Sequence, residues 1–227
     1  MDVNNISNEI WLIRHGESVS NANLKTIHPA RTPLTETGLQ QSRSMASYID
    51  TAPDRIIVSS YTRSMQTAQF CIEKHKNAKL ETWPVHEFTY LDNKAYRNTT
   101  ASERRGPIND YWEQADPQMK NKGAESFEEF FFRAQSVILK LRELKGFTVM
   151  ISHGHTIRMI WWLLISGLPK PTREVMSSYA LLRRGFYIPN CSILKVRFFK
   201  NGEVWMSNLF YDFLPPELRI LVKDQSL

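Results

Sequence analysis

Two Arg and two His side chains and one carboxylate follow apolar segments of this sequence and could act together on a phosphate group. They are Arg14, His15, Arg63, Glu87 and His153. Arginine offers planar, paired N–H donors that fit the oxygens of a phosphate. An imidazole that is neutral at pH 7 keeps a lone pair for nucleophilic attack. These residue types therefore suit phosphoryl transfer, in which catalysis consists mainly of positioning and charge neutralisation.

Short apolar strands and the helices between them must position these residues. The continuous hydrophobicity of residues 10–13 and 56–58 is typical of strands buried on both faces of a sheet. We predict two further strands over residues 80–85 and 147–151, and helices over about 34–48, 62–74, 126–144 and 156–166. Each candidate residue then follows the carboxyl end of a strand, which is where open α/β sheets bind ligands.

The last part of the chain has the pattern of an antiparallel hairpin. Residues 192–199 and 203–209 flank Asn201-Gly202, a dipeptide favoured in tight hairpin turns. Strands and helices that alternate and end in a hairpin predict the α/β class. We expect a three-layer α/β/α sandwich whose sheet is mostly parallel with an antiparallel edge. We also expect residues 1–227 to form a single domain.

Residues 88–125 interrupt this alternation. They carry Pro, Gly and charges with weak periodicity, so we expect an excursion that covers the substrate and holds one short helix near Tyr111. The next helix has a clear start, because Ser126 and Glu129 have the spacing of a capping box. Some basic residues of the excursion either bind a second anionic group of the substrate or form a solvated loop, and the sequence leaves both readings open: Lys94, Arg97, Arg104 and Arg105.

Several motifs resemble those of the histidine phosphatase superfamily, which includes the cofactor-dependent phosphoglycerate mutases. The blocks are Leu12-Ile13-Arg14-His15-Gly16-Glu17-Ser18, Pro33-Leu34-Thr35-Glu36-Thr37-Gly38, Ser59-Ser60-Tyr61-Thr62-Arg63-Ser64-Met65-Gln66-Thr67-Ala68 and Ile151-Ser152-His153-Gly154-His155-Thr156-Ile157-Arg158, with Pro189-Asn190-Cys191-Ser192 beyond them. A lone Arg-His-Gly is a weak signal, but several blocks in family order are a strong one. The resemblance implies a phosphoglycerate mutase-like fold.

The resemblance also implies a role for each site residue. His15 is the expected nucleophile, Arg14 and Arg63 clamp the phosphate, and Asn21 donates from its amide. The expected role of His153 is that of a second cationic or hydrogen-bonding partner. Glu87 is the expected acid and base, and Asp92 is its nearest substitute.

We therefore predict a phosphomonoester hydrolase that acts through a phosphohistidine on a small anionic phosphorylated substrate. One alternative is a cofactor-dependent phosphoglycerate mutase, although the segment between Glu87 and His153 is short and lacks the Tyr-Gly element associated with mutases. Another is a non-catalytic module that binds phosphate or phosphoproteins. Such a module would be expected to have lost one of the site residues, and all of them are present.

The composition argues against several other classes of protein. The net charge of +6 is spread along the chain and mixed with acids, so we expect no nucleic-acid partner. The longest apolar run, residues 159–165, is far below the roughly 20 residues that span a bilayer. The first residues do not resemble a secretory signal, so we expect no membrane partner and a cytoplasmic location. The sequence does not determine the oligomeric state.

Metal and cofactor chemistry are not expected either. The chain has two cysteines, Cys71 and Cys191, which are too few for a disulfide framework or a zinc cluster. His153 and His155 alternate as metal ligands can, but no carboxylate follows them and Arg158 would oppose a cation. We therefore predict no metal and no cofactor.

Overall fold

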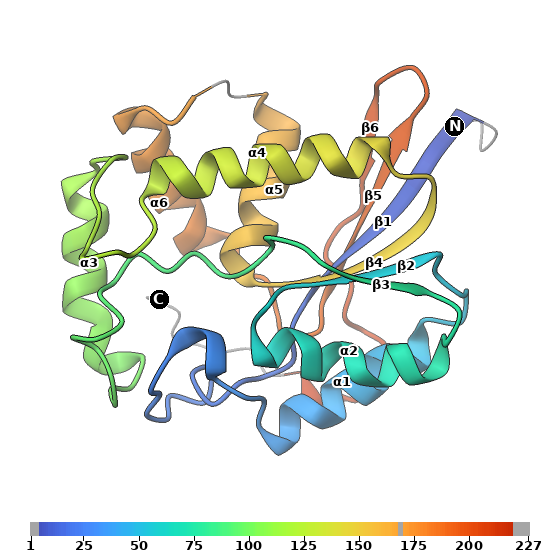
Figure 1. Cartoon of the computed structure of the whole chain (residues 1–227), viewed down its shortest axis with the longest axis horizontal. Helices are drawn as coiled ribbons and strands as arrows, with labels where there is room; N and C mark the ends of the chain where they lie inside the picture. Colours follow the sequence, from blue (N-terminus) through green and yellow to red (C-terminus); the bar gives the residue numbers. More distant parts are fainter. Residues whose placement is uncertain (1–4, 168–169, 220–227) are drawn as a thin grey trace.

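A six-stranded mixed sheet forms the centre of the protein, whose computed structural model describes residues 5–167 and 170–219. The strands are β1 (Ile6–Arg14), β2 (Arg55–Val58), β3 (Lys79–Thr82), β4 (Gly146–Ser152), β5 (Ile193–Phe199) and β6 (Val204–Met206). Their order is β3-β2-β4-β1-β5-β6, with β1 to β4 parallel and β5 and β6 antiparallel (Figure 1). The predicted parallel sheet with an antiparallel edge is confirmed.

Helices cover both faces of this sheet. Helices α1 (Glu36–Tyr48) and α2 (Thr62–Lys74) lie on one face, and α4 (Phe127–Glu143) and α5 (Gly154–Ser166) lie on the other (Figure 1). Strand residues alternate between the two layers: Ile10 and Leu12 belong to the core that includes α4 and α5, and Ile13 to the core that includes α1 and α2. The three-layer sandwich is confirmed. No helix of the described residues has both the length and the hydrophobicity to cross a membrane.

The excursion contains the predicted short helix near Tyr111. It is α3 (Arg105–Gln114), which lies at the end of the molecule away from the hairpin (Figure 1). Within the described residues, short 3-10 helices lie at Pro29–Arg31, Ser102–Arg104 and Pro216–Leu218. The predicted capping box at the start of α4 is present: the Ser126 hydroxyl accepts from the backbone N–H of Glu129 at 3.1 Å, and the Glu129 carboxylate accepts from the backbone N–H of Ser126 at 3.1 Å.

Two predicted strands are shorter in the structure, and one helix was not predicted. Strand β3 ends at Thr82 rather than at residue 85, because Pro84 has no N–H to donate to a neighbouring strand. Strand β6 is also shorter than the predicted residues 203–209. Helix α6 (Arg173–Gly185) was not predicted, although Thr172 caps it by accepting from the Val175 N–H. The prediction that residues 1–227 form one domain stays a prediction.

Candidate active site

The carboxyl ends of β1 and β4 bring two histidines together. These strands are adjacent and parallel, with Arg14 paired to Ser152, so the next residue of each strand lies at the same edge. His15 donates its backbone N–H to the carbonyl of Ser152 at 3.0 Å. The rings of His15 and His153 consequently lie with their centroids 5.0 Å apart.

The hydrogen bonds of His15 define its tautomer. Its Nδ1 lies 2.6 Å from the Gly16 carbonyl oxygen, and the Nε of Arg63 donates to its Nε2 at 3.0 Å. An arginine N–H can only donate, so Nε2 is the unprotonated nitrogen and Nδ1 carries the proton. Burial, with Arg63 and Arg14 adding to it, holds the pKa of His15 well below its usual value. The ring is therefore neutral at pH 7, with its lone pair on Nε2.

The two arginines are buried and anchored to backbone carbonyls. Arg14 Nη1 donates to Ile188 at 2.5 Å, and Arg63 Nη1 donates to Pro29 at 2.6 Å. Burial lowers the pKa of Arg63 to about 10, which leaves it charged at pH 7. Neither guanidinium forms an ion pair with a carboxylate in the part of the chain that the structure describes. Their charge therefore remains available to an anion in the cavity that both side chains line.

The amide of Asn21 is oriented by its neighbours. Its Oδ1 accepts from the backbone N–H of Ser18 at 3.1 Å, from the Ser18 hydroxyl at 2.9 Å and from Asn190 Nδ2 at 3.3 Å. The amide nitrogen keeps its donors for the cavity, which Asn21 lines. Asn190 Nδ2 also donates to the His15 carbonyl at 2.8 Å. Asn190 belongs to the motif Pro189-Asn190-Cys191-Ser192, but no role was predicted for it from the sequence.

His153 lies behind His15 and is fully buried. Its Nε2 is 2.7 Å from the Ser59 hydroxyl, and its Nδ1 has no hydrogen-bond partner among the described residues. Burial, and then Arg63, holds the pKa of His153 well below its usual value. Its ring is therefore neutral at pH 7. Of the two roles predicted for it, the electrostatics favour the hydrogen-bonding one over the cationic one.

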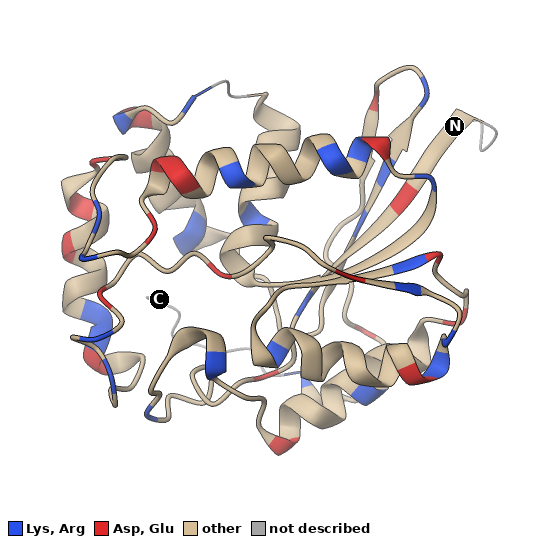
Figure 2. Ribbon diagram, viewed as in Figure 1, with Lys and Arg blue, Asp and Glu red and all other residues tan. Residues whose placement is uncertain are grey.

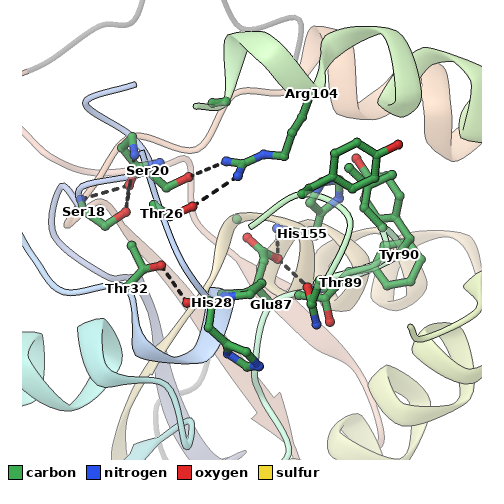
Figure 3. Close-up of a pocket in the computed structure, with 18 of the residues that line it drawn as sticks. Ser18, Ser20, Thr26, His28, Thr32, Glu87, Thr89, Tyr90, Arg104 and His155 are labelled. Atoms are coloured by element: carbon green, nitrogen blue, oxygen red, sulfur yellow. Dashed lines mark hydrogen bonds between the residues drawn. The ribbon is translucent and has the colours of Figure 1, made fainter. Parts of the chain in front are cut away.

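Glu87 lines the same cavity from the segment after β3. Its Oε1 accepts from the backbone N–H groups of His155 at 3.0 Å and Phe88 at 3.1 Å, which fixes the carboxylate (Figure 3). A Cβ placed on Gly154 would lie 3.8 Å from Glu87 Oε2 and 3.7 Å from Arg14 Nε. The second carboxylate oxygen therefore lies on the same side of the cavity as the arginine.

The segment before Glu87 is held by side chains rather than by the sheet. Arg133 Nη1 donates to the carbonyls of Pro84 and His86, at 2.9 and 3.0 Å. The guanidinium also pairs with both oxygens of Glu125, at 2.6 and 2.7 Å. Thr156 adds a 2.7 Å bond to the His86 carbonyl. These contacts replace the ladder bonds that are lost where β3 ends.

The glycine after His15 is required by packing. A Cβ on Gly16 would lie 2.4 Å from the carbonyl oxygen of Gly38, and one on Gly38 would lie 2.0 Å from the Glu17 carbonyl oxygen. The loop after β1 and the start of α1 therefore approach more closely than side chains permit. Gly16 is therefore needed for the contact between this loop and α1.

The cavity has a volume of about 240 Å³. Beyond the residues above, its wall contains Phe88, Tyr90, Leu91, Tyr96 and Ile108, together with Asp92, Arg104 and Arg158. Of the four basic residues left open by the sequence, Arg104 lines this cavity and Lys94 and Arg97 line a neighbouring groove, whereas Arg105 lines neither. Asp92 is engaged in its own turn, because its Oδ1 accepts from the N–H groups of Lys94 and Ala95.

A metal centre is not found within residues 5–167 and 170–219, where no three His, Cys, Asp or Glu side chains are grouped to hold an ion. Cys71 and Cys191 are both buried and free. Burial raises the pKa of the Cys71 thiol to about 11 and that of Cys191 to about 12. Neither thiol is therefore ionised at pH 7.

Comparison with known proteins identifies the family of this chain. The model of the histidine phosphatase superfamily, branch 1, matches residues 10–207. The chain belongs to this superfamily. The adenosylcobalamin/alpha-ribazole phosphatase of Escherichia coli strain K12 is 24% identical over 168 residues, which cover 70% of this chain and 80% of that protein. The relative of the same name from Salmonella typhi is 34% identical over 85 residues, and this match spans 37% of the present chain and 42% of the relative.

Solved structures show the same histidine phosphatase fold. The alpha-ribazole phosphatase from Shigella flexneri superposes with a TM-score of 0.71 at 19% identity, covering 90% of this chain and 96% of that one. Phosphoserine phosphatase from Entamoeba histolytica gives a TM-score of 0.69 at 21% identity, covering 92% of this chain and all of its own. At these identities the likeness concerns the fold, and the predicted fold is confirmed.

Proposed function

We propose that this chain is a phosphomonoester hydrolase in which Nε2 of His15 attacks phosphorus. The observation that carries the proposal is the state of His15, a neutral ring fixed by the Gly16 carbonyl with its lone pair beside the guanidinium of Arg63. Two anchored arginines and a carboxylate share its cavity. The relatives named as phosphatases support the same reaction class.

The first step forms a phosphohistidine. A bound phosphate takes the N–H of Arg63 that points at Nε2, which frees the lone pair of His15. As the P–N bond forms, the P–O ester bond breaks, and protonated Glu87 gives its proton to the leaving oxygen. Arg14, Arg63 and the amide of Asn21 donate to the phosphoryl oxygens. The Gly16 carbonyl accepts from Nδ1–H and stabilises the positive charge that develops on the ring.

The second step transfers the phosphoryl group to water. Glu87, now ionised, takes a proton from a water molecule whose oxygen attacks phosphorus. The P–N bond breaks, its electron pair returns to Nε2, and inorganic phosphate leaves. No metal or cofactor takes part in either step. The substrate that fits is a small anionic phosphate ester, and a cytoplasmic location stays a prediction.

Rapid-quench labelling tests the phosphohistidine directly. A phosphorylated aryl substrate with labelled phosphate should give an acid-labile protein adduct on His15, followed by release of stoichiometric free phosphate. His15→Ala should abolish both, since the proposed attack uses Nε2 of His15. His28→Asn is the matched control, because His28 is an exposed histidine that also lines the cavity. Label on His28, or full turnover by His15→Ala, would contradict the proposal.

The same experiment separates a phosphatase from a mutase. A mutase must keep its phosphoenzyme from water while the substrate reorients. With a phosphoglycerate as substrate, we expect free phosphate and no positional isomer. Turnover of the aryl phosphate should also persist in excess chelator. Isomer formation faster than phosphate release would make the chain a mutase, and loss of activity in chelator with recovery on added zinc or magnesium would overturn the mechanism.

A further inference from the structure

An outer groove of about 830 Å³ opens beside the mouth of the catalytic cavity. The two share part of their lining: Thr26, Ile27, His28, Thr32, Asp92 and Asn93. The groove is built by three loop segments, residues 19–33, 92–97 and 122–124. Because the lining is continuous, a ligand whose phosphate lies at His15 can extend from the cavity into the groove.

The groove is strongly basic. Five exposed cations line it: Lys25, Arg31, Lys94, Arg97 and Lys122. In Figure 2, blue segments, which mark Lys and Arg, appear on the loops at the lower left. Across the described ranges none of the five forms an ion pair. The one acid in the lining, Asp92, has its Oδ1 taken by backbone N–H groups. Such a surface concentrates anions.

The segment between the two cationic regions is largely apolar. Phe88, Tyr90, Leu91 and Tyr96 line the cavity on the way out. At the boundary, the apolar residue Ile27 is exposed and lines both the cavity and the groove. Apolar and aromatic side chains therefore form part of the lining that joins the floor of the cavity to the groove.

Hydrogen bonds hold this boundary in place. Thr26 and Thr99 form an antiparallel bridge, with the N–H of Thr26 donating to the Thr99 carbonyl at 3.0 Å. Arg104 donates to the hydroxyls of Thr26 at 3.1 Å and Ser20 at 3.2 Å (Figure 3). These bonds join the loop that holds Thr26 to the segment that holds Arg104, two residues 78 positions apart in sequence, at the mouth of the cavity. The position of the groove relative to His15 is set by the fold.

We propose that the outer groove binds a second anionic group of the substrate, a carboxylate or phosphate separated from the scissile phosphate by an apolar or aromatic portion. This inference rests on the proposed function and names its substrate class. Charge complementarity with exposed surface cations acts mainly on encounter and binding. The groove should therefore lower KM and leave kcat almost unchanged.

A matched substrate series tests the groove. Phenyl phosphates carry a para alkyl chain of increasing length that ends in a carboxylate, and each is compared with its neutral carboxamide. At the best length we expect kcat/KM for the carboxylate to exceed that for the carboxamide by about tenfold, through KM. The preference should fall as salt is raised. Equal kcat/KM for both members at every length would overturn the proposal.

Substitution assigns the preference to the groove. The double variant Lys94→Gln/Arg97→Gln should reduce the roughly tenfold ratio to about twofold. The control Lys76→Gln/Lys170→Gln removes the same charge from exposed lysines that line neither cavity nor groove, and should keep the ratio. If both double variants lose the ratio equally, the preference for the carboxylate depends only on the net charge of the protein, and the proposed groove site is wrong.

Two further outcomes keep the tests of function and groove apart. If no compound of the series is hydrolysed, the proposed function fails, and calorimetry with the phosphonate analogues then tests the groove alone, with tighter binding of the carboxylate expected. A peptide whose phosphorylated residue is flanked by acidic residues tests whether the groove recognises a macromolecule instead. If only the peptide shows a preference that depends on Lys94 and Arg97, the small-molecule assignment is wrong.

Discussion

The floor of the cavity and the outer groove are both positively charged, but the charges are held differently. Arg14 and Arg63 at the floor are 8% and 7% exposed and are bonded to backbone carbonyls. Lys94 and Arg97 in the groove are exposed and have no ion-pair partner among the described residues. The anchored arginines therefore hold their donors in a fixed geometry. The exposed cations of the groove supply an electrostatic field that attracts anions.

This difference predicts which kinetic constant each region controls. A buried donor placed within hydrogen-bond distance of the reacting atoms acts on the transition state. An exposed lysine is hydrated and screened, so its contribution is small and depends on salt. Substitutions at the floor should therefore lower kcat, whereas substitutions in the groove should raise KM for anionic substrates.

Among the conservative substitutions considered below, the largest effect is expected from Arg63→Lys, which keeps the charge and removes the planar donor fork. A lysine cannot reach both His15 Nε2 and the Pro29 carbonyl in the geometry of the guanidinium. We expect kcat/KM with an aryl phosphate to fall about 10²- to 10³-fold. Steady-state kinetics measures the loss, with Lys94→Arg as the exposed control. Nearly full activity in Arg63→Lys would show that charge alone suffices at the floor.

Glu87→Gln should separate substrates by their leaving groups. An alkyl phosphate needs a proton on its leaving oxygen, so its kcat should fall about 10²-fold or more. Nitrophenyl phosphate leaves as a stable phenolate and should lose less than about tenfold. The comparison of the two losses is the measurement. Equal losses would argue against Glu87 as the acid and point to Asp92, on the same wall.

Arg133→Lys should have a smaller effect with the same dependence on the leaving group. The side chain touches no substrate position, but it holds the carbonyls before Glu87 and is itself paired with Glu125. We expect kcat with an alkyl phosphate to fall about tenfold, and Glu87→Gln/Arg133→Lys to be no worse than Glu87→Gln alone.

The control for Arg133 is Arg197→Lys. Arg197 of β5 pairs with Glu9 of β1 at 2.7 Å, and neither residue lines the cavity. It should show any general cost of removing an arginine ion pair, without dependence on the leaving group. Additive losses in the Glu87 and Arg133 double variant would mean that Arg133 supports the fold rather than the position of Glu87.

The smallest predicted effect is a decline in stability below neutral pH, to which the buried histidines at the floor contribute. The pKa values of His15 and His153 are held well below normal in the folded protein, first by burial. In the unfolded chain these rings take up protons near pH 6.5. Below that pH the unfolded state binds more protons, so the free energy of unfolding should fall as the pH drops from 7 to 5.

Urea unfolding across this pH range measures the effect. His153→Gln should flatten the profile, because it removes one ring that must stay neutral. His28→Asn should not, since His28 is exposed. A free energy of unfolding that stays constant between pH 7 and pH 5 would contradict the burial of neutral histidines at the floor.

Local signals in the sequence predicted most of the strands and helices and the residues that meet at the floor of the cavity. Strand periodicity and the Ser126 capping box are local signals, and both predicted the corresponding elements. The convergence of Arg14, His15 and His153 followed from the rule that parallel strands end at one edge. The tautomer of His15 could be expected because a buried imidazole needs a partner for its N–H.

The contacts around this floor, in contrast, could be identified only in the folded protein. The end of β3 at Thr82, the support of Glu87 by Arg133 and the bond from Asn190 to the His15 carbonyl join residues far apart in the chain. The separation of Arg104 from Lys94 and Arg97 likewise depends on how the excursion packs. Such contacts follow no periodicity, because they are selected by packing of the whole chain and not by neighbours in sequence.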